Sequence, residues 1–195
     1  MKKRVIGITG GVGTGKSTVL EYLRKSRGAQ IIQADLVARE LMEPGGSSYE
    51  AVRKAFGPGI LTEDGRIDRK ELAGIIFGDE EKRKLLNSLT HPLVKEEVRR
   101  QIEMSDASLV VYEAALPGEA GMRELCGEIW TVTAPAEVRI RRLMSDRGYS
   151  REKCLEIMDA QLSEDEFRRW SDAVIDNGGK PEQTKEELGK LLRKS

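Results

Sequence analysis

The sequence lacks any long apolar run. No stretch approaches the roughly 18 consecutive apolar residues of a membrane-spanning helix. The opening residues MKKRVIGITGG also lack the apolar core and the small-residue cleavage site of a secretory signal peptide. We therefore expect a cytoplasmic protein that does not associate with membranes.

Cysteine is scarce, with only Cys126 and Cys154 in 195 residues. The two are too far apart for a CxxC element, and a reducing compartment disfavours a structural disulfide. We expect both to be small apolar packing residues without a redox or metal-binding role.

An excess of charge of one sign is also missing, because 33 lysines and arginines balance 33 aspartates and glutamates. Dedicated nucleic-acid-binding proteins usually carry a basic field. The balance therefore favours a small-molecule substrate over a nucleic acid partner. We expect a monomer or a weak homo-oligomer.

What the sequence does contain is an alternation of β-branched runs and amphipathic segments. The predicted strands are 4–10, 29–35, 108–114, 128–134 and 172–177, and the predicted helices between them are 16–26, 36–43, 135–145 and 181–194. Such alternation is typical of an α/β fold with a parallel sheet covered on both faces.

Residues 47–105 depart from this alternation and are predicted to form a helical insertion. Asp68 and Glu71 have the spacing of a capping box, and Pro92 suits the first turn of a helix. The core is accordingly predicted to comprise residues 1–46 and 106–195.

The segment Gly10–Ser17 reads GGVGTGKS and matches G-x-x-x-x-G-K-[ST], with a predicted strand before it and a helix after it. Glycines let backbone amides turn towards a polyphosphate, and the helix adds the positive end of its dipole. Lys16 should reach the β- and γ-phosphates of ATP, and the Ser17 hydroxyl should coordinate Mg²⁺. The predicted nucleotide-binding residues are Gly11, Val12, Gly13, Thr14, Gly15, Lys16, Ser17 and Thr18.

Three further features bear on what the protein does with a bound nucleotide. Asp35 ends the second predicted strand, where it is either a general base or the N-cap of the next helix. Glu113 is at the end of the third predicted strand, where its carboxylate is either a partner for magnesium or a solvated charge. Four arginines (Arg139, Arg141, Arg142 and Arg147) either close on the substrate as part of a lid or form a solvated helix face.

The base-reading N-K-x-D element of GTPases and the serine-glycine signature of transporter ATPases are both absent from the sequence. A small-molecule kinase is therefore the leading class. The alternatives are a different P-loop kinase, such as a nucleoside kinase, and a nucleotide-dependent binding switch.

Longer stretches of the chain resemble the dephospho-CoA kinase family. They are IGITGGVGTGKSTV, ADLVARELMEPG, LTEDGRIDRKELAGIIFGDEEKRKLLNSLTHPLVKEEV, RLMSDRGYSREKCLEIMDAQ and SDAVIDNGG. The resemblance implies a P-loop NTPase fold of three α/β/α layers, a helical CoA-binding domain at 47–105 and a lid at about 142–165. It also implies transfer of the ATP γ-phosphoryl group to the ribose 3′-hydroxyl of dephospho-CoA.

The resemblance assigns roles to particular residues. Lys16, Asp35 as base and the lid residue Arg142 are implied to be catalytic, and Asn177 is implied to border the adenine site. Ser17 and Glu113 are implied to serve the metal. Besides Asp35, the implied contacts to dephospho-CoA are Arg69, Phe77 and His91, although a histidine before Pro92 at a helix start also suits a structural or capping role.

The chain departs from the family pattern at three places. Gln33 stands where the family has a first aspartate, so Asp35 is the remaining candidate base. Glu113 replaces an aspartate and is one methylene longer. Asp146 aligns with a second lid arginine, and Arg147 lies about 100° further around a helix, so it is not a direct replacement.

Overall fold

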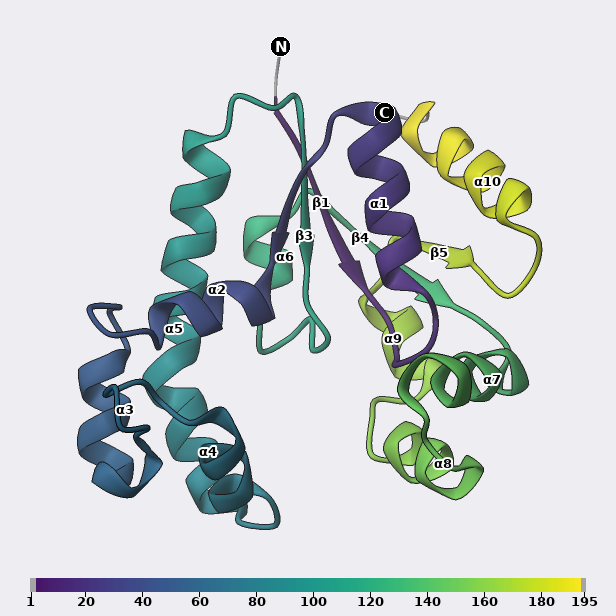
Figure 1. Cartoon of the computed structure of the whole chain (residues 1–195). Helices are drawn as coiled ribbons and strands as arrows, with labels where there is room; N and C mark the ends of the chain where they lie inside the picture. The colour runs from purple at the N-terminus through teal and green to yellow at the C-terminus, as the bar shows by residue number, and fades with distance from the viewer. Residues whose placement is uncertain (1–2, 194–195) are drawn as a thin grey trace. The chain divides into compact units, whose positions relative to one another are not determined.

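The computed structural model describes residues 3–193, which form an α/β fold (Figure 1). Within this range, five strands lie in one sheet in the order β2-β3-β1-β4-β5. Their bounds are β1 Arg4–Thr9, β2 Gln30–Gln33, β3 Leu109–Glu113, β4 Glu128–Thr133 and β5 Ala173–Asp176. β1 pairs in parallel with β3 and β4, and β4 pairs in parallel with β5. The carboxyl ends of these four strands therefore share one edge.

The chain divides into two compact units, one of residues 1–31 and 105–195 and one of residues 32–104. The helices of the first unit are α1 Lys16–Arg27, α6 Met122–Leu125, α7 Ala136–Arg147, α8 Arg151–Asp159, α9 Glu164–Trp170 and α10 Pro181–Arg193. Residue 194, predicted to end the last helix, lies outside the described residues. The second unit holds α2 Ala34–Leu41, α3 Tyr49–Phe56, the 3₁₀ turn Pro58–Ile60, α4 Arg69–Ile76 and α5 Glu80–Met104.

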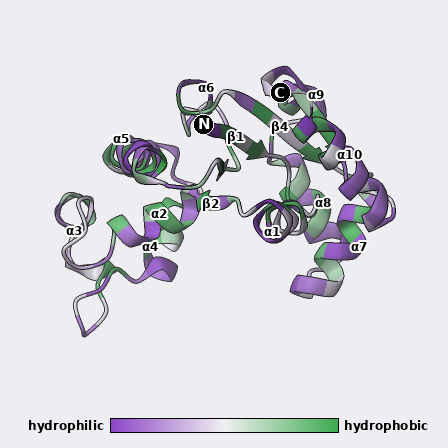
Figure 2. Cartoon of the chain, turned by 90° about the horizontal axis from the view of Figure 1, so that it is seen from above, coloured by the Kyte–Doolittle hydropathy of each residue, from purple (hydrophilic) through white to green (hydrophobic). Residues whose placement is uncertain are grey.

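Helices cover both faces of the sheet. On one face, α1 and α10 bury Leu23 and Leu188 against Ile6, Ile8 and Trp130 of the sheet. On the other face, a Cβ added at Gly7 would lie 3.2 Å from Cys126 Sγ, just after α6. Figure 2 shows β1 drawn largely in green, as expected of a strand buried on both sides. The predicted three-layer α/β/α arrangement with a parallel sheet is confirmed.

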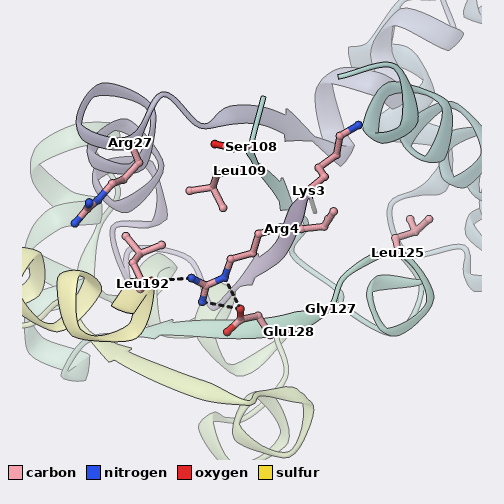
Figure 3. A pocket seen from close by; sticks show the side chains of 10 residues that line it. Lys3, Arg4, Arg27, Ser108, Leu109, Leu125, Gly127, Glu128 and Leu192 are labelled. Carbon is pink, nitrogen blue, oxygen red and sulfur yellow. Dashed lines mark hydrogen bonds and ion pairs between the residues drawn. The ribbon is translucent and has the colours of Figure 1, made fainter. Parts of the chain in front are cut away.

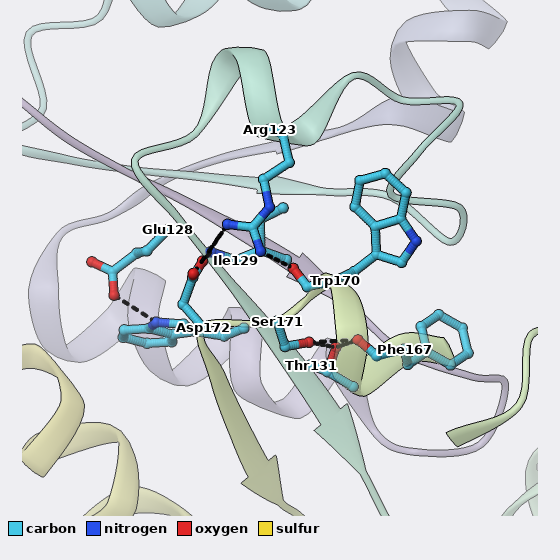
Figure 4. A network of polar contacts seen from close by, with 9 residues as sticks. Arg123, Glu128, Ile129, Thr131, Phe167, Trp170, Ser171 and Asp172 are labelled. Atoms are coloured by element: carbon cyan, nitrogen blue, oxygen red, sulfur yellow. Dashed lines mark hydrogen bonds and ion pairs between the residues drawn. The ribbon is translucent and has the colours of Figure 1, made fainter. Parts of the chain in front are cut away.

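A polar network fastens the end of α9 to the same sheet (Figure 4). The Arg123 guanidinium donates to Asp172 Oδ2 at 2.8 Å and to the Trp170 carbonyl at 2.6 Å. Asp172 Oδ2 also accepts the Ile129 N–H at 2.7 Å. One carboxylate thus joins α6, β4 and the segment that follows α9, so the last helix before β5 is anchored.

Arg4 closes the opposite, amino end of the sheet (Figure 3). Its guanidinium donates to Glu128 Oε1 at 2.8 Å and to the Leu192 carbonyl at 3.0 Å, and it lies 5.6 Å from the centre of the Trp130 ring. Carbonyl groups in the last turn of a helix lack intrahelical donors, and a cation there also meets the negative end of the dipole. Arg4 therefore joins β1, β4 and α10.

Replacing Arg4 with methionine should lower the free energy of unfolding by about 1–3 kcal/mol, because the change leaves a half-buried carboxylate and helix carbonyls without their donor. Urea denaturation followed by circular dichroism measures the effect. The control is Arg24→Met, which removes an exposed pair with Glu21 on one helix and should cost at most about 0.5 kcal/mol. Equal losses in the two variants would contradict the bridging role of Arg4.

The second unit begins at residue 32, earlier than the predicted insertion at 47, because α2 packs against α5. Its core is a separate apolar cluster. The buried members of that cluster are Tyr49, Val52, Ile60, Ile67 and Leu72. The predicted helical character of this segment is observed.

The capping role of Asp68 is confirmed in one direction. Its carboxylate accepts the N–H groups of Lys70 at 2.9 Å and Glu71 at 3.2 Å. In a capping box, the Glu71 side chain would accept the Asp68 N–H. Here the Asp68 N–H donates to the Ile60 carbonyl at 2.7 Å instead. The cap therefore also fixes α4 to the turn before it.

Pro92 does not begin a helix, and this prediction is wrong. It lies inside the 25-residue helix α5. A proline cannot donate to the carbonyl four residues earlier, which normally disfavours helix. Here Thr90, Val94, Val98 and Ile102 share one buried face at four-residue spacing, and their packing carries the helix through the proline.

Candidate active site

The phosphate loop connects β1 to α1 and has the predicted strand-loop-helix context. Gly10 has φ +141°, and a Cβ there would lie 2.3 Å from the Val132 carbonyl oxygen. Gly15 has φ +85°, and a Cβ there would lie 2.2 Å from Asn177 Nδ2. Both positions therefore require glycine. Because Gly15 is the N-cap of α1, no side chain caps this helix. The positive end of the α1 dipole faces the loop.

Lys16 folds back over this loop. Its Nζ donates to the carbonyl of Gly10 at 2.7 Å and lies 3.3 Å from that of Gly11. It also lies 4.0 Å from Glu113 Oε1 at the end of β3. Only 18% of the Lys16 side chain and 12% of the Glu113 side chain are exposed. The structure thus brings the predicted phosphate-binding lysine and the predicted metal-binding carboxylate to one place.

The hydroxyl residues of the motif differ in their surroundings. Thr14 is buried, and its Oγ1 donates to the Gly11 carbonyl at 2.9 Å, which closes the loop on itself. Ser17 and Thr18 are exposed in the first turn of α1. They line a cavity of about 520 Å³ together with Asn177 and Thr184. Ser17 and Thr18 are therefore accessible to a ligand, whereas Thr14 is an internal brace.

Asn177 supports the loop through its side chain. The buried Nδ2 donates to the Thr14 carbonyl at 2.9 Å, and Oδ1 accepts the Thr184 hydroxyl at 3.1 Å. Position 177 follows β5 at the carboxyl edge of the sheet. The residue predicted to border the adenine site thus contacts the phosphate loop itself.

Arg142 also contacts the phosphate loop. From α7, its guanidinium donates to the carbonyls of Gly13 at 3.3 Å and Thr14 at 3.1 Å, and to that of Asn177 at 2.7 Å. Asp146 and Arg147 are exposed in the last turn of α7. Because this turn is helical, Arg147 lies about 100° around the helix from Asp146, as predicted. Of the sequence candidates in this helix, Arg142 and Arg139 reach the loop.

Gln161 is a contact residue that the sequence reasoning missed. Its Oε1 accepts the Val12 N–H at 2.8 Å, and Arg139 Nε donates to the Val12 carbonyl at 2.8 Å. The sequence feature that points to Gln161 is its position as the last residue of RLMSDRGYSREKCLEIMDAQ, one of the stretches that resemble the family.

Asp35 corrects the predicted end of the second strand. β2 ends at Gln33, and Asp35 is the second residue of α2. The N-cap of α2 is Gln33, so the capping alternative for Asp35 is wrong. The segment from Ala34 is strongly amphipathic and forms a helix that packs against α5. Asp35 is exposed, and its carboxylate lies in the positive first turn of the helix.

The remaining predicted substrate contacts belong to the second unit. Arg69 begins α4 and donates to Glu43 Oε1 at 2.9 Å. Phe77 follows α4 with 84% of its surface exposed, a position that packing alone does not account for. His91 is half-buried in the middle of α5, so it is not a helix cap.

The two cysteines are free, with Cys154 fully buried. Burial raises the pKa of the Cys126 thiol to about 12, so the thiolate needed for redox or metal chemistry is disfavoured at neutral pH. Cys154 packs in an apolar cluster with Ile140 and Leu143.

Magnesium suits the oxygen donors next to the loop. Among residues 3–193, no group of three or more histidine, cysteine, aspartate or glutamate side chains is arranged so that it could hold a metal ion. A magnesium ion that takes most of its ligands from phosphate and water needs only one or two protein oxygens. The Ser17 hydroxyl and the Glu113 carboxylate are the two oxygen donors that the sequence predicts for such an ion.

The comparisons with known proteins agree with this geometry. A family model described as dephospho-CoA kinase matches residues 4–183. The dephospho-CoA kinase of Carboxydothermus hydrogenoformans is 43% identical over 193 residues, covering 97% of this chain and 93% of the relative. That of Geobacter sulfurreducens is 40% identical over 97% of this chain and 98% of its own.

Solved structures give a similar result. The dephospho-CoA kinase from Campylobacter jejuni superposes with a TM-score of 0.71 at 27% identity, covering 98% of this chain and 96% of that one. Separately, no helix formed by the described residues has both the length and the apolar character that crossing a membrane requires.

Proposed function

The chain belongs to the dephospho-CoA kinase family, and from this premise we propose that it transfers the γ-phosphoryl group of ATP to the ribose 3′-hydroxyl of dephospho-CoA. The products are coenzyme A and ADP. The observation that carries the proposal is the phosphate loop, where Lys16 Nζ lies between the Gly10 carbonyl at 2.7 Å and Glu113 at 4.0 Å.

Positioning and charge do most of the work in phosphoryl transfer. The loop amides and the N-terminus of α1 would hold the polyphosphate, and Lys16 would neutralise charge that develops on the transferred group. Ser17 and Glu113 would hold Mg²⁺, which when bound offsets phosphate charge. These residues belong to the first unit, where their contacts fix them relative to the sheet.

The acceptor hydroxyl needs a base. As its oxygen forms a bond to the γ-phosphorus, the bond from phosphorus to the β,γ-bridging oxygen breaks and leaves ADP. The hydroxyl proton passes to the carboxylate that we propose as base, Asp35. Asp35 makes no capping bond in α2, which leaves its carboxylate available for this proton.

The second unit is proposed to hold the CoA portion, with Arg69, Phe77 and His91 as contacts. An exposed aromatic ring and an exposed guanidinium suit a ligand that carries both an adenine ring and phosphates. The segment at about 142–165 is proposed as the lid. Arg142 would meet the phosphates from it on closure.

An acceptor assay tests the proposal. Purified protein with ATP and Mg²⁺ should form ADP with dephospho-CoA, and turnover with adenosine, uridine or shikimate should be at least about 100-fold lower in kcat/KM, roughly 3 kcal/mol of discrimination. Chelation with EDTA should abolish turnover, and added Mg²⁺ should restore it.

Two results would contradict the assignment. Turnover of a nucleoside with none of dephospho-CoA would identify a different P-loop kinase. Equal ADP formation with and without an acceptor would support the nucleotide-dependent switch.

A further inference from the structure

Val12, in the phosphate loop, is held by residues far away in the sequence. Its side chain packs on the apolar cluster of Ile140, Leu143 and Cys154 from α7 and α8. Its N–H and its carbonyl are bonded by Gln161 and Arg139, both at 2.8 Å. The side chain, the N–H and the carbonyl of Val12 are therefore each contacted by α7, α8 or the connection that follows α8.

Gln161 occupies the short connection between α8 and α9. Its N–H donates to the Met158 carbonyl at 3.3 Å, which continues the last turn of α8. Its Oε1 meets two donors, the Val12 N–H and Arg139 Nη2 at 3.5 Å. Since both partners can only donate, the amide oxygen must face them, and the orientation of the side chain is determined.

Gly11 leaves room for the side chains of Arg139 and Gln161 next to the loop. A Cβ added at Gly11 would lie 2.5 Å from Arg139 Nη2 and 3.2 Å from Gln161 Oε1. Partial burial lowers the pKa of Arg139 from its ordinary value, while Glu164 acts in the opposite direction. Burying this guanidinium has a cost, and its bond to Val12 offsets that cost.

We propose that Gln161 is a positioning residue for the phosphate loop, which acts by binding the Val12 amide and holding Arg139 against the Val12 carbonyl. Fixing the Val12 peptide plane sets the direction from which the following loop amides approach a polyphosphate. The inference rests on the proposed function for its substrate, ATP, and assigns to Gln161 a role in nucleotide affinity without contact to the acceptor.

Gln161→Leu removes the acceptor and keeps most of the volume. Without it, the half-buried Val12 N–H loses its partner and the loop samples more conformations. The expected result is a roughly ten-fold rise in both the Kd of Mg·ADP and the KM of ATP. The KM of dephospho-CoA and the Tm should stay near those of the parent protein. Isothermal calorimetry with Mg·ADP, steady-state kinetics and thermal melting measure these quantities.

Two further variants separate positioning from folding. Gln161→Glu keeps an acceptor for both donors, with its charge offset by Arg139, and should restore the Kd of Mg·ADP to within about three-fold. The matched control is Gln183→Leu, since Gln183 Oε1 likewise accepts a backbone N–H, that of Lys180 at 3.0 Å, at the start of α10. This control should leave nucleotide affinity unchanged. If Gln161→Leu fails to fold, Gln161→Met repeats the test with an unbranched chain.

Each contrary result overturns the positioning role. A Gln161→Leu protein that binds Mg·ADP within two-fold of the parent would do so. So would a Gln161→Glu protein as weak as Gln161→Leu, or a fall in Tm with both KM values raised together. If the parent protein binds Mg·ADP but does not phosphorylate dephospho-CoA, the proposed function fails, and the Mg·ADP series still decides the role of Gln161.

Discussion

Replacing Lys16 with methionine is expected to lower kcat/KM for ATP by about 1,000-fold, or roughly 4 kcal/mol of transition-state stabilisation. Methionine keeps most of the unbranched length of the lysine side chain and loses its charge. In the structure, Lys16 Nζ lies against the Gly10 carbonyl at 2.7 Å and near Glu113 at 4.0 Å, so it sits over the loop that would hold the phosphates. A compact ammonium on a flexible stem can follow charge as it moves from the γ-phosphoryl group to the leaving oxygen.

Steady-state kinetics with ATP and dephospho-CoA measures the loss of Lys16, and circular dichroism checks folding. Lys190→Met is the matched control, because Lys190 is exposed on α10 and pairs with Glu186 at 2.8 Å. Its activity should equal that of the parent protein. Lys16→Arg should recover little, since a planar guanidinium is larger and directs its hydrogen bonds differently. If Lys16→Met kept more than a tenth of the parent kcat/KM, the loop would not be the site of transfer.

Replacing Asp35 with asparagine is expected to reduce kcat by about 100- to 1,000-fold, the range of general base catalysis. The substitution keeps the shape of the side chain and removes its ability to take a proton. Because Gln33 is the N-cap of α2, Asp35 contributes to folding only through the dipole of the first turn. Loss of that interaction costs about 0.3–1 kcal/mol, so the variant should fold.

The kcat of Asp35→Asn and its free energy of unfolding should be measured together. Glu40→Gln is the control, as an exposed carboxylate on the same helix neutralised in the same way. An unchanged kcat would refute the base assignment. A raised KM for dephospho-CoA with kcat retained would make Asp35 a binding residue, and a large loss of stability would return it to a structural role.

The phosphate loop was predictable because its backbone requirements are local. Gly10 and Gly15 have φ angles of +141° and +85°, which favour glycine. The β-branched run before the loop and the amphipathic run after it decide strand and helix within a few residues. The Asp68 cap was predictable for the same reason. The family resemblance added the acceptor, which no local pattern specifies.

The errors arose where packing overruled local preference. Pro92 is a helix breaker by itself, yet Val94 and Val98 on a buried face hold α5 together around it. The prediction puts Asp35 at a strand end because the segment IIQAD contains no glycine or proline that would mark a boundary between strand and helix. That boundary was set by α2 packing against α5.

Local sequence patterns are enough to predict the phosphate loop, the α/β alternation and the helical character of residues 47–104, because hydrogen bonds and side-chain periodicity within a few residues fix these features. The contacts that support the loop, in contrast, join segments that are far apart in the chain. Gln161 meets Val12 across 149 positions and Asn177 meets Thr14 across 163. Contacts of that separation depend on how helices pack on a sheet, which local sequence does not encode.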